Sequence, residues 1–163
     1  MKKLFAVLLI LLCLCSCKGN EIKPKLSEIS FTAKLTYFNE LYVFDGEIKK
    51  DGTLIANIKE PSELKDLKLT VTEEVMTADY KGLVYEANEA TMPFSKIISD
   101  FYSAINALGR EEKLKTDKSG ETTGKIGDTE YTLVLSPTGL PQSLELSVRH
   151  ITVKFYNLSV KEE

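Results

Sequence analysis

The chain has 163 residues, enough for one domain with a sizeable core and too few for two comfortable ones. Apolar residues make up 43% of the sequence and charged residues 28%, proportions that indicate a folded domain and exclude a disordered chain. The net charge of -3 excludes the basic surface typical of nucleic-acid-binding proteins, so no nucleic-acid partner is expected.

Residues 1–16 have the pattern of an export signal. Lys2 and Lys3 give a positive start, and the apolar run from Leu4 to Leu14 is too short to remain as a membrane-spanning helix. The run ends in Leu-Cys-Ser-Cys, which resembles the bacterial lipobox, with cleavage after Ser16 and Cys17 as the first mature residue. The alternative is an apolar start that ends in a cysteine by chance.

The resemblance to a lipobox implies that the Cys17 thiol carries diacylglycerol. Two acyl chains of palmitate length suffice for stable membrane anchoring. The other cysteines, Cys13 and Cys15, lie in the signal, so the mature domain has no disulfide and no thiol nucleophile. We expect a lipid-anchored, extracytoplasmic protein on the cell membrane or the outer membrane. Lys18 replaces the aspartate associated with inner-membrane retention, which favours the outer membrane where the host has one.

Residues 17–29 are polar, contain glycine and proline, and show little periodicity. They are interpreted as a lipidated tether to a domain over residues 30–163, because regular apolar alternation begins only at Phe31. The alternative is that they form an irregular edge of the domain.

From Phe31 onward apolar residues recur with a period of two, which predicts about nine or ten strands. Asp45-Gly46 and Asp51-Gly52 are predicted turns, and a further turn is placed at Asn39-Glu40. Residues 121–126 are polar and are predicted to form an edge strand.

One segment changes period. Apolar residues at three- and four-residue spacing predict a helix over residues 93–108, with Pro93 in its first turn and Gly109 just past its end. Phe101 lies four residues after Ile97 and four before Ile105, so these three side chains should face the core. The predicted fold is mostly β (α+β): a curved antiparallel sheet that forms a half-barrel around one central helix.

This order of elements resembles the half-barrel domains of the lipoprotein carriers LolA and LolB and related lipid-binding lipoproteins. Three stretches carry the resemblance: the early meander closed by Pro61 to Leu67, the segment from Tyr80 to Tyr85 that leads to Met92-Pro93, and the Gly139-Leu140-Pro141 hairpin. The resemblance implies an apolar pocket between sheet and helix that accepts acyl chains. It departs from LolA itself, which is not lipidated, and no arginine matches one that would regulate a lid.

The candidate pocket has two predicted walls. Leucines and isoleucine of the sheet form one wall: Leu35, Leu54, Ile58, Leu67 and Leu69. The helix supplies the other: Phe94, Ile98, Phe101 and Ile105. A curved sheet of this many strands encloses more space than one short helix fills, although protein interiors normally pack densely enough to close such a gap.

Catalytic patterns are missing from the sequence. His150 is the sole histidine, which is too few ligands for a zinc site, and no Gly-x-Ser-x-Gly accompanies it. The carboxylate pairs Glu73-Glu74 and Glu111-Glu112 are adjacent residues, which point to opposite faces of a strand. We therefore expect no enzyme, no cofactor and no metal.

Two functions remain open from the sequence. The first is a membrane-anchored lipoprotein that binds an apolar ligand, either a lipid or a lipidated partner, in the half-barrel. The second is a structural or protein-interaction lipoprotein of the cell envelope, whose sheet face is filled by its own side chains. A monomer is expected in both cases.

Overall fold

The computed structural model describes residues 19–87 and 92–161. The predicted signal peptide and Cys17 lie outside these ranges. The described part contains twelve strands, one α-helix and two 3-10 turns. In chain order the elements are β1 (Asn20–Ile22), β2 (Ile29–Tyr37), β3 (Glu40–Ile48), β4 (Leu54–Glu60), η1 (Ser62–Leu64), β5 (Leu67–Val71), β6 (Met76–Tyr80), β7 (Leu83–Glu86), α2 (Pro93–Gly109), β8 (Leu114–Thr116), β9 (Glu121–Ile126), β10 (Thr129–Leu135), β11 (Pro141–Leu146), η2 (Ser147–Arg149) and β12 (Ile151–Val160).

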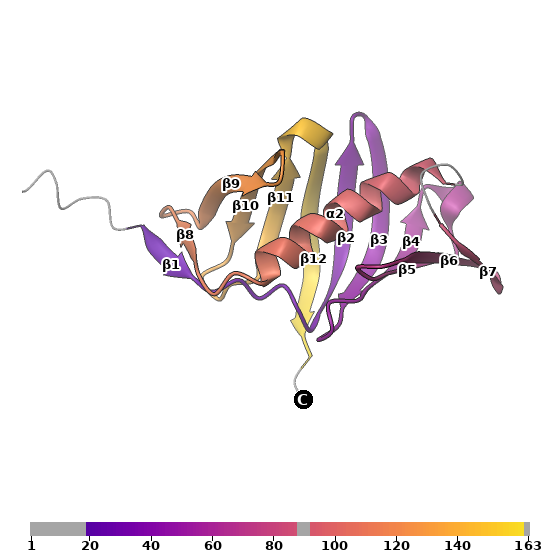
Figure 1. The fold of residues 1–163 in the computed structure, drawn as a ribbon, viewed down its shortest axis with the longest axis horizontal. Helices are drawn as coiled ribbons and strands as arrows, with labels where there is room; N and C mark the ends of the chain where they lie inside the picture. Colours follow the sequence, from indigo (N-terminus) through magenta and orange to yellow (C-terminus); the bar gives the residue numbers. More distant parts are fainter. Residues whose placement is uncertain (1–18, 88–91, 162–163) are drawn as a thin grey trace, which may run out of the picture.

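Ten of the strands form one antiparallel sheet in the order β7-β6-β5-β4-β3-β2-β12-β11-β10-β9. Strands β2 to β7 form a meander, and β9 to β12 form a second one. Pairing of β12 with β2, from Ile151↔Tyr37 to Val160↔Ile29, joins the two meanders into one sheet. The remaining strands, β1 and β8, form a separate two-stranded ribbon at one end of the molecule (Figure 1).

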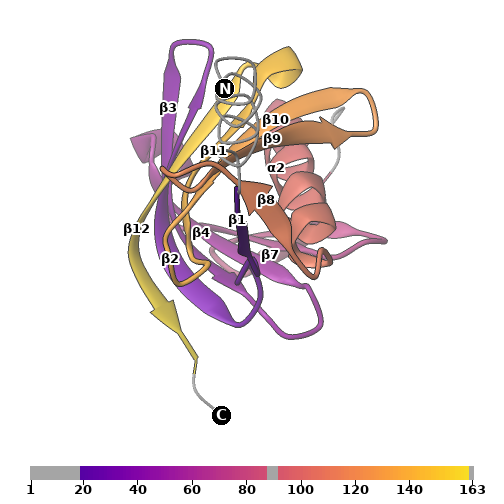
Figure 2. The ribbon, with the colours of Figure 1, turned by 90° about the vertical axis from the view of Figure 1, so that its left-hand side faces the viewer.

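The sheet bends around α2, which lies across its concave face (Figure 2). The register shifts within the pairs β3–β4, β2–β12 and β10–β11, and such bulges increase local twist and bend. Strands β7 and β9 are the two edges of the sheet and do not pair with each other, so the barrel stays open. The predicted fold class, a mostly antiparallel half-barrel around one helix, is confirmed.

Helix α2 begins at Pro93, as predicted, and ends at Gly109, one residue beyond the predicted end. Proline suits the first helical turn because its missing N–H has no intrahelical partner there. The predicted core stripe is confirmed: Ile97, Phe101 and Ile105 are all buried, and Phe101 is fully so. The helix therefore lies with its apolar face on the sheet.

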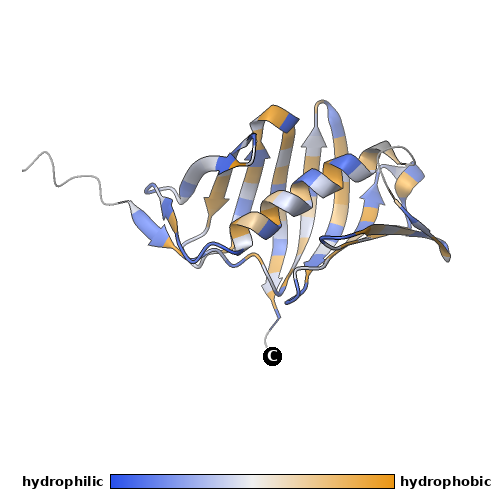
Figure 3. Ribbon diagram, viewed as in Figure 1, coloured by the Kyte–Doolittle hydropathy of each residue, from blue (hydrophilic) through white to orange (hydrophobic). Residues whose placement is uncertain are grey.

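The strands facing α2 alternate between buried and exposed side chains. In β2, Phe31, Ala33 and Leu35 are buried while Lys34 between them is exposed. The same alternation is visible along the strands as bands of opposite hydropathy (Figure 3). Burying one face of each strand fixes its register, because a slip of one residue would turn the apolar set outward.

Asp45 and Gly46 lie inside β3, so the turn predicted there is wrong. Gly46 pairs with Phe31 of β2, and a Cβ atom at residue 46 would lie 2.4 Å from the Phe31 ring. The glycine makes room for this ring instead of forming a turn. The turn predicted at Asp51-Gly52 is present, with Gly52 at φ +83°.

Residues 19–29 belong to the folded domain, contrary to the tether predicted over residues 17–29. Strand β1 pairs with β8, from Asn20↔Thr116 to Ile22↔Leu114. The Lys25 N–H donates to the Gly139 carbonyl at 2.8 Å, and Leu26 is only 2% exposed. Buried Leu26 is an isolated apolar residue between polar neighbours, which is why periodicity did not reveal it.

Candidate functional site

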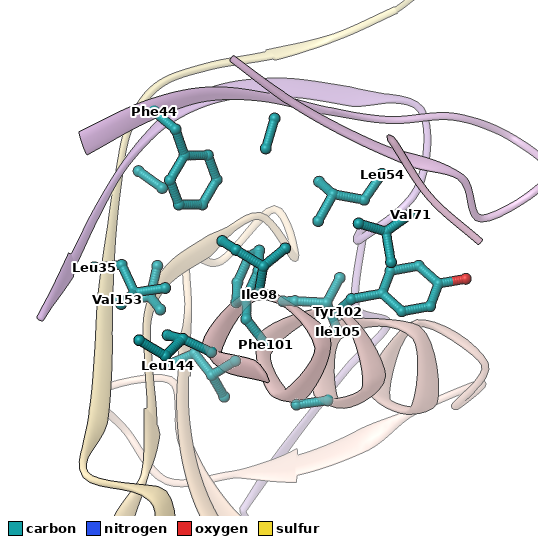
Figure 4. Close-up of a cluster of buried hydrophobic side chains, with 14 of the residues drawn as sticks. Leu35, Phe44, Leu54, Val71, Ile98, Phe101, Tyr102, Ile105, Leu144 and Val153 are labelled. Carbon is teal, nitrogen blue, oxygen red and sulfur yellow. The ribbon is translucent and has the colours of Figure 1, made fainter. Parts of the chain in front are cut away.

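All nine residues of the predicted pocket walls lie in the core between α2 and the sheet. Each is at most 6% exposed, and all belong to one cluster of buried residues. The close-up of this cluster shows Ile98, Phe101 and Ile105 of the helix facing Leu35 and Leu54 of the sheet (Figure 4). The two predicted sets of side chains therefore face each other in the core, and their role as the walls of a ligand pocket stays a prediction.

Aromatic rings fill the centre of this cluster. Phe101 meets Phe44 at 5.9 Å between ring centroids and Phe155 at 6.1 Å. Nearer the start of α2, Phe94 stacks on Tyr42 of β3, with centroids 4.3 Å apart. Phe44, Phe155 and Tyr42 were not among the predicted wall residues. Their rings pack against Phe94 and Phe101 of the helix wall and so lie between the two predicted walls.

A pocket of about 230 Å³ remains beside the second half of α2, next to β4. We call it the α2–β4 pocket. Two predicted wall residues, Leu54 and Ile105, contribute to it. It is lined by Leu26, Ser27, Ile48, Lys50, Asp51, Gly52, Leu54, Tyr102, Ile105, Asn106, Gly109 and Arg110. Buried apolar side chains therefore meet a charged rim in one cavity.

Tyr102 supplies a hydrogen-bonding group to the α2–β4 pocket. The side chain is 7% exposed, and its hydroxyl points away from the apolar cluster (Figure 4). No hydrogen bond joins this hydroxyl to another described residue, and desolvation by burial raises its pKa, with a smaller contribution from the charge of Asp51. Tyr102 therefore stays protonated and can donate to an oxygen of a ligand. Tyr102 lies four residues after Ile98 and so on the same face of the helix, although it was not among the predicted pocket residues.

Ion pairs on the rim hold the end of α2 against the sheet. Arg110 pairs with Glu73, which follows β5, and the Asn106 side-chain amide donates to the same carboxylate at 3.0 Å. Across the pocket, Lys50 lies 4.0 Å from Glu28. These exposed pairs order the rim, although each contributes little to stability.

A second charged group lies on the other side of α2. Arg149 of η2 approaches Asp100 of the helix at 3.8 Å and Asp128, between β9 and β10, at 3.6 Å. Lys96 also pairs with Asp100, at 3.3 Å. Both arginines of the chain, Arg110 and Arg149, thus link the helix to the rim of the sheet, a role that was not predicted for either of them.

Catalytic or metal-binding arrangements were not expected, and the described residues contain no group of three or more histidine, cysteine, aspartate or glutamate side chains that could hold a metal ion. His150 is exposed and its ring lies tilted against that of Phe38, with centroids 4.5 Å apart. Within residues 19–87 and 92–161, no helix is long and apolar enough to cross a membrane.

Solved structures with a similar chain path exist, although sequence comparison finds no relative. No family model matches the chain, and no curated protein matches it. A solved structure of a LolA superfamily protein from Nitrosomonas europaea is similar, with 8% sequence identity and a TM-score of 0.40. The similarity covers 83% of this chain and 86% of that chain. The fold class stated above rests on the strand order and registers of the chain itself.

Proposed function

We propose that this protein is a bacterial lipoprotein, anchored through Cys17, that binds an apolar ligand between α2 and the sheet. The α2–β4 pocket carries the proposal, because it joins the buried side chains of Leu54 and Ile105 to the hydroxyl of Tyr102, which has no hydrogen-bond partner among the described residues. Ligand sites typically combine an apolar lining with a few polar groups that fix orientation.

The pocket dimensions restrict the ligand. Its volume of about 230 Å³ lies below the range of roughly 300–1,000 Å³ for drug-sized ligands. An engineered apolar cavity of about 150 Å³ holds benzene, so the pocket has room for a short apolar chain. A carbonyl or carboxylate oxygen on this chain would accept a hydrogen bond from Tyr102, and the charged rim would contact its solvated end.

The sequence of the first 17 residues supports the proposed anchor. The chain has a positively charged start and then an apolar run. The run ends in a small residue and a cysteine at the spacing of a lipobox, and no cysteine follows Cys17. Replacing Cys17 by Ser should move the protein out of the membrane fraction of cells. Unchanged partitioning would refute the anchor, and mass spectrometry of the mature N-terminus would detect the lipid directly.

Ligand binding is tested with a fluorescent fatty-acid probe on a chain that begins at residue 18, which retains every described strand. We expect saturable binding with one probe per chain. Ser27 is exposed and lines the pocket, so Ser27→Trp should occupy the pocket and weaken binding about tenfold or more without opening the core. Ser62→Trp, at an exposed serine of η1, is the matched control and should bind normally.

Tyr102→Phe isolates the polar contact. Because the hydroxyl makes no hydrogen bond within the described protein, its removal should leave the melting temperature unchanged. Loss of one hydrogen bond to a ligand should weaken binding of a carbonyl-bearing probe by about 0.5–1.5 kcal/mol. An apolar probe without an oxygen should bind Tyr102→Phe as tightly as it binds the parent chain.

The alternative function is a protein-interaction lipoprotein with a filled core. The aromatic packing around Phe101 favours it, and so does the edge strand β7, where Leu83 is 72% and Val84 is 66% exposed. Large exposed apolar residues on a free edge are typical of surfaces that contact other chains. Absence of saturable probe binding in a folded chain would leave this alternative standing.

A further inference from the structure

The ribbon of β1 and β8 lies very close to the predicted lipid. Strand β1 begins at Asn20, three residues after Cys17. An extended chain covers about 3.3–3.6 Å per residue, so three residues span at most about 11 Å. A lipid on Cys17 would therefore hold this ribbon within roughly that distance of the headgroups. Little slack remains for the domain to turn another surface toward the bilayer.

This end of the molecule is basic, although the protein as a whole is acidic. Residues 18–25 and 110–121 together carry seven basic and five acidic residues, a net charge of +2. The mature chain carries 19 basic and 24 acidic residues, because Lys2 and Lys3 are removed with the signal, and its net charge is -5. The rest of the mature chain therefore carries a net charge of -7.

Most lysines of this end have no acidic partner. The exposed lysines around the ribbon are Lys23, Lys25, Lys113, Lys115 and Lys118. Lys113 pairs with Glu21 at 3.1 Å. The other four make no ion pair with a described residue. Asp117, in the β8–β9 turn, accepts hydrogen bonds from the Ser119 and Glu121 N–H groups at 2.8 and 2.9 Å and pairs with no lysine of the described residues.

The ribbon also presents its charge outward. Leu114 and Thr116 of β8 are buried against the domain, so Lys115 between them points to solvent. The separate ribbon lies at the opposite end of the long axis from the apolar edge strand β7 (Figure 1). The basic and the apolar exposed surfaces are thus at the two ends of the molecule.

We propose that the β1–β8 ribbon is a membrane-contact surface that docks on anionic lipid headgroups beside the lipidated Cys17. The proposal rests on the anchor of the proposed function and is independent of the ligand pocket. Lysines near an anionic bilayer each favour docking by about fivefold, and the short link keeps them within reach. Docking directs the half-barrel away from the bilayer, with β7 as its distal end.

The orientation is measured on the mature lipidated protein in vesicles. The chain contains no tryptophan, so a single introduced one reports on one place. Ser119→Trp places the reporter in the β8–β9 turn, and Val84→Trp places it at the distal edge; both residues are exposed. With phosphatidylglycerol vesicles that contain a headgroup-nitroxide lipid, Ser119→Trp fluorescence should be quenched strongly and Val84→Trp fluorescence weakly.

Charge dependence separates docking from mere proximity to the anchor. Quenching of the residue 119 reporter should fall in phosphatidylcholine vesicles, and also at about 1 M salt, where the Debye length is about 3 Å. Adding Lys115→Glu and Lys118→Glu should lower the docked-to-undocked ratio by more than tenfold. Lys65→Glu with Lys68→Glu, two exposed lysines near η1 and β5, is the matched control and should have no effect.

Two results would overturn the proposal. The first is equal quenching of the two tryptophans. The second is quenching at residue 119 that does not change with the charge of the vesicle or with the substitution of Lys115 and Lys118 by glutamate. Failure of the anchor is recognised separately, because the protein would then lack the lipid mass on Cys17 and would not enter vesicles. Far-ultraviolet circular dichroism of each variant excludes misfolding as the cause of a lost signal.

Discussion

The ring of Phe101 on α2 meets the ring of Phe44 on β3 edge to face, with centroids 5.9 Å apart, and both side chains are fully buried. This contact joins the helix to the middle of the sheet. Truncation of a buried phenylalanine to alanine costs about 3–5 kcal/mol, a large part of the stability of a domain of this size. We expect Phe101→Ala to lower the unfolding free energy by that amount in urea denaturation. Ser103→Ala, at an exposed position of the same helix, should change it by less than about 0.5 kcal/mol.

Gly46 provides a second test of core packing. A Cβ at this position would lie 2.4 Å from two atoms of the Phe31 ring, so Gly46→Ala should destabilise the domain by about 1–3 kcal/mol through overpacking. Phe31→Leu removes the obstructing ring. If the steric explanation is correct, the double variant will lose less stability than the sum of the single variants, as measured in a double-mutant cycle. Strict additivity would contradict it.

Much of the fold could be predicted from the sequence, because one face of each strand and one stripe of the helix are buried and therefore apolar. Phe31, Leu35 and Phe101 carry that signal, and all are in the core. The positions of the turns were harder to predict from the sequence. The β2–β3 turn contains Phe38 at φ +51°, a conformation that a bulky residue seldom adopts, so the sequence favoured Asn39-Glu40 instead.

The candidate site was predicted only in part. Periodicity identifies which side chains face the interior, and it placed Leu54 and Ile105 correctly. It does not measure how much space the opposing rings of Phe44 and Tyr42 occupy. The rim was also unpredictable, because Arg110 and its partner Glu73 are far apart in sequence and meet only through the bend of the sheet.

Tyr42 should make stability sensitive to alkaline pH. Desolvation by burial, followed by the hydrogen bond to Glu40 at 2.5 Å and the charge of that carboxylate, raises the pKa of Tyr42 to about 12. A tyrosine in the unfolded chain has a pKa near 10. Because the folded pKa is the higher one, this contribution to stability is fully present below pH 10 and is lost as the pH rises through about 12.

Tyr42→Phe is the variant that checks this pH dependence. Urea denaturation of both chains between about pH 9 and 12 should show the stability difference changing only above pH 10, where parent stability falls faster. Tyr85→Phe, at a half-exposed tyrosine of β7, serves as the control and should follow the parent curve. Parallel curves for Tyr42→Phe and the parent would show that the Tyr42 pKa is the same in both states.

Leu26 decides whether residues 19–29 are a tether or part of the domain. Its side chain is 2% exposed, belongs to the main apolar cluster and lines the α2–β4 pocket. In a free tether, Leu26→Ala would be neutral. In the observed fold it should cost about 2–5 kcal/mol and widen the pocket. Ser27→Ala, at the exposed neighbouring residue, should be neutral in both cases. A melting temperature of Leu26→Ala equal to that of Ser27→Ala would therefore show that the segment does not pack against the domain, and it would also remove the short link on which the orientation of the β1–β8 ribbon depends.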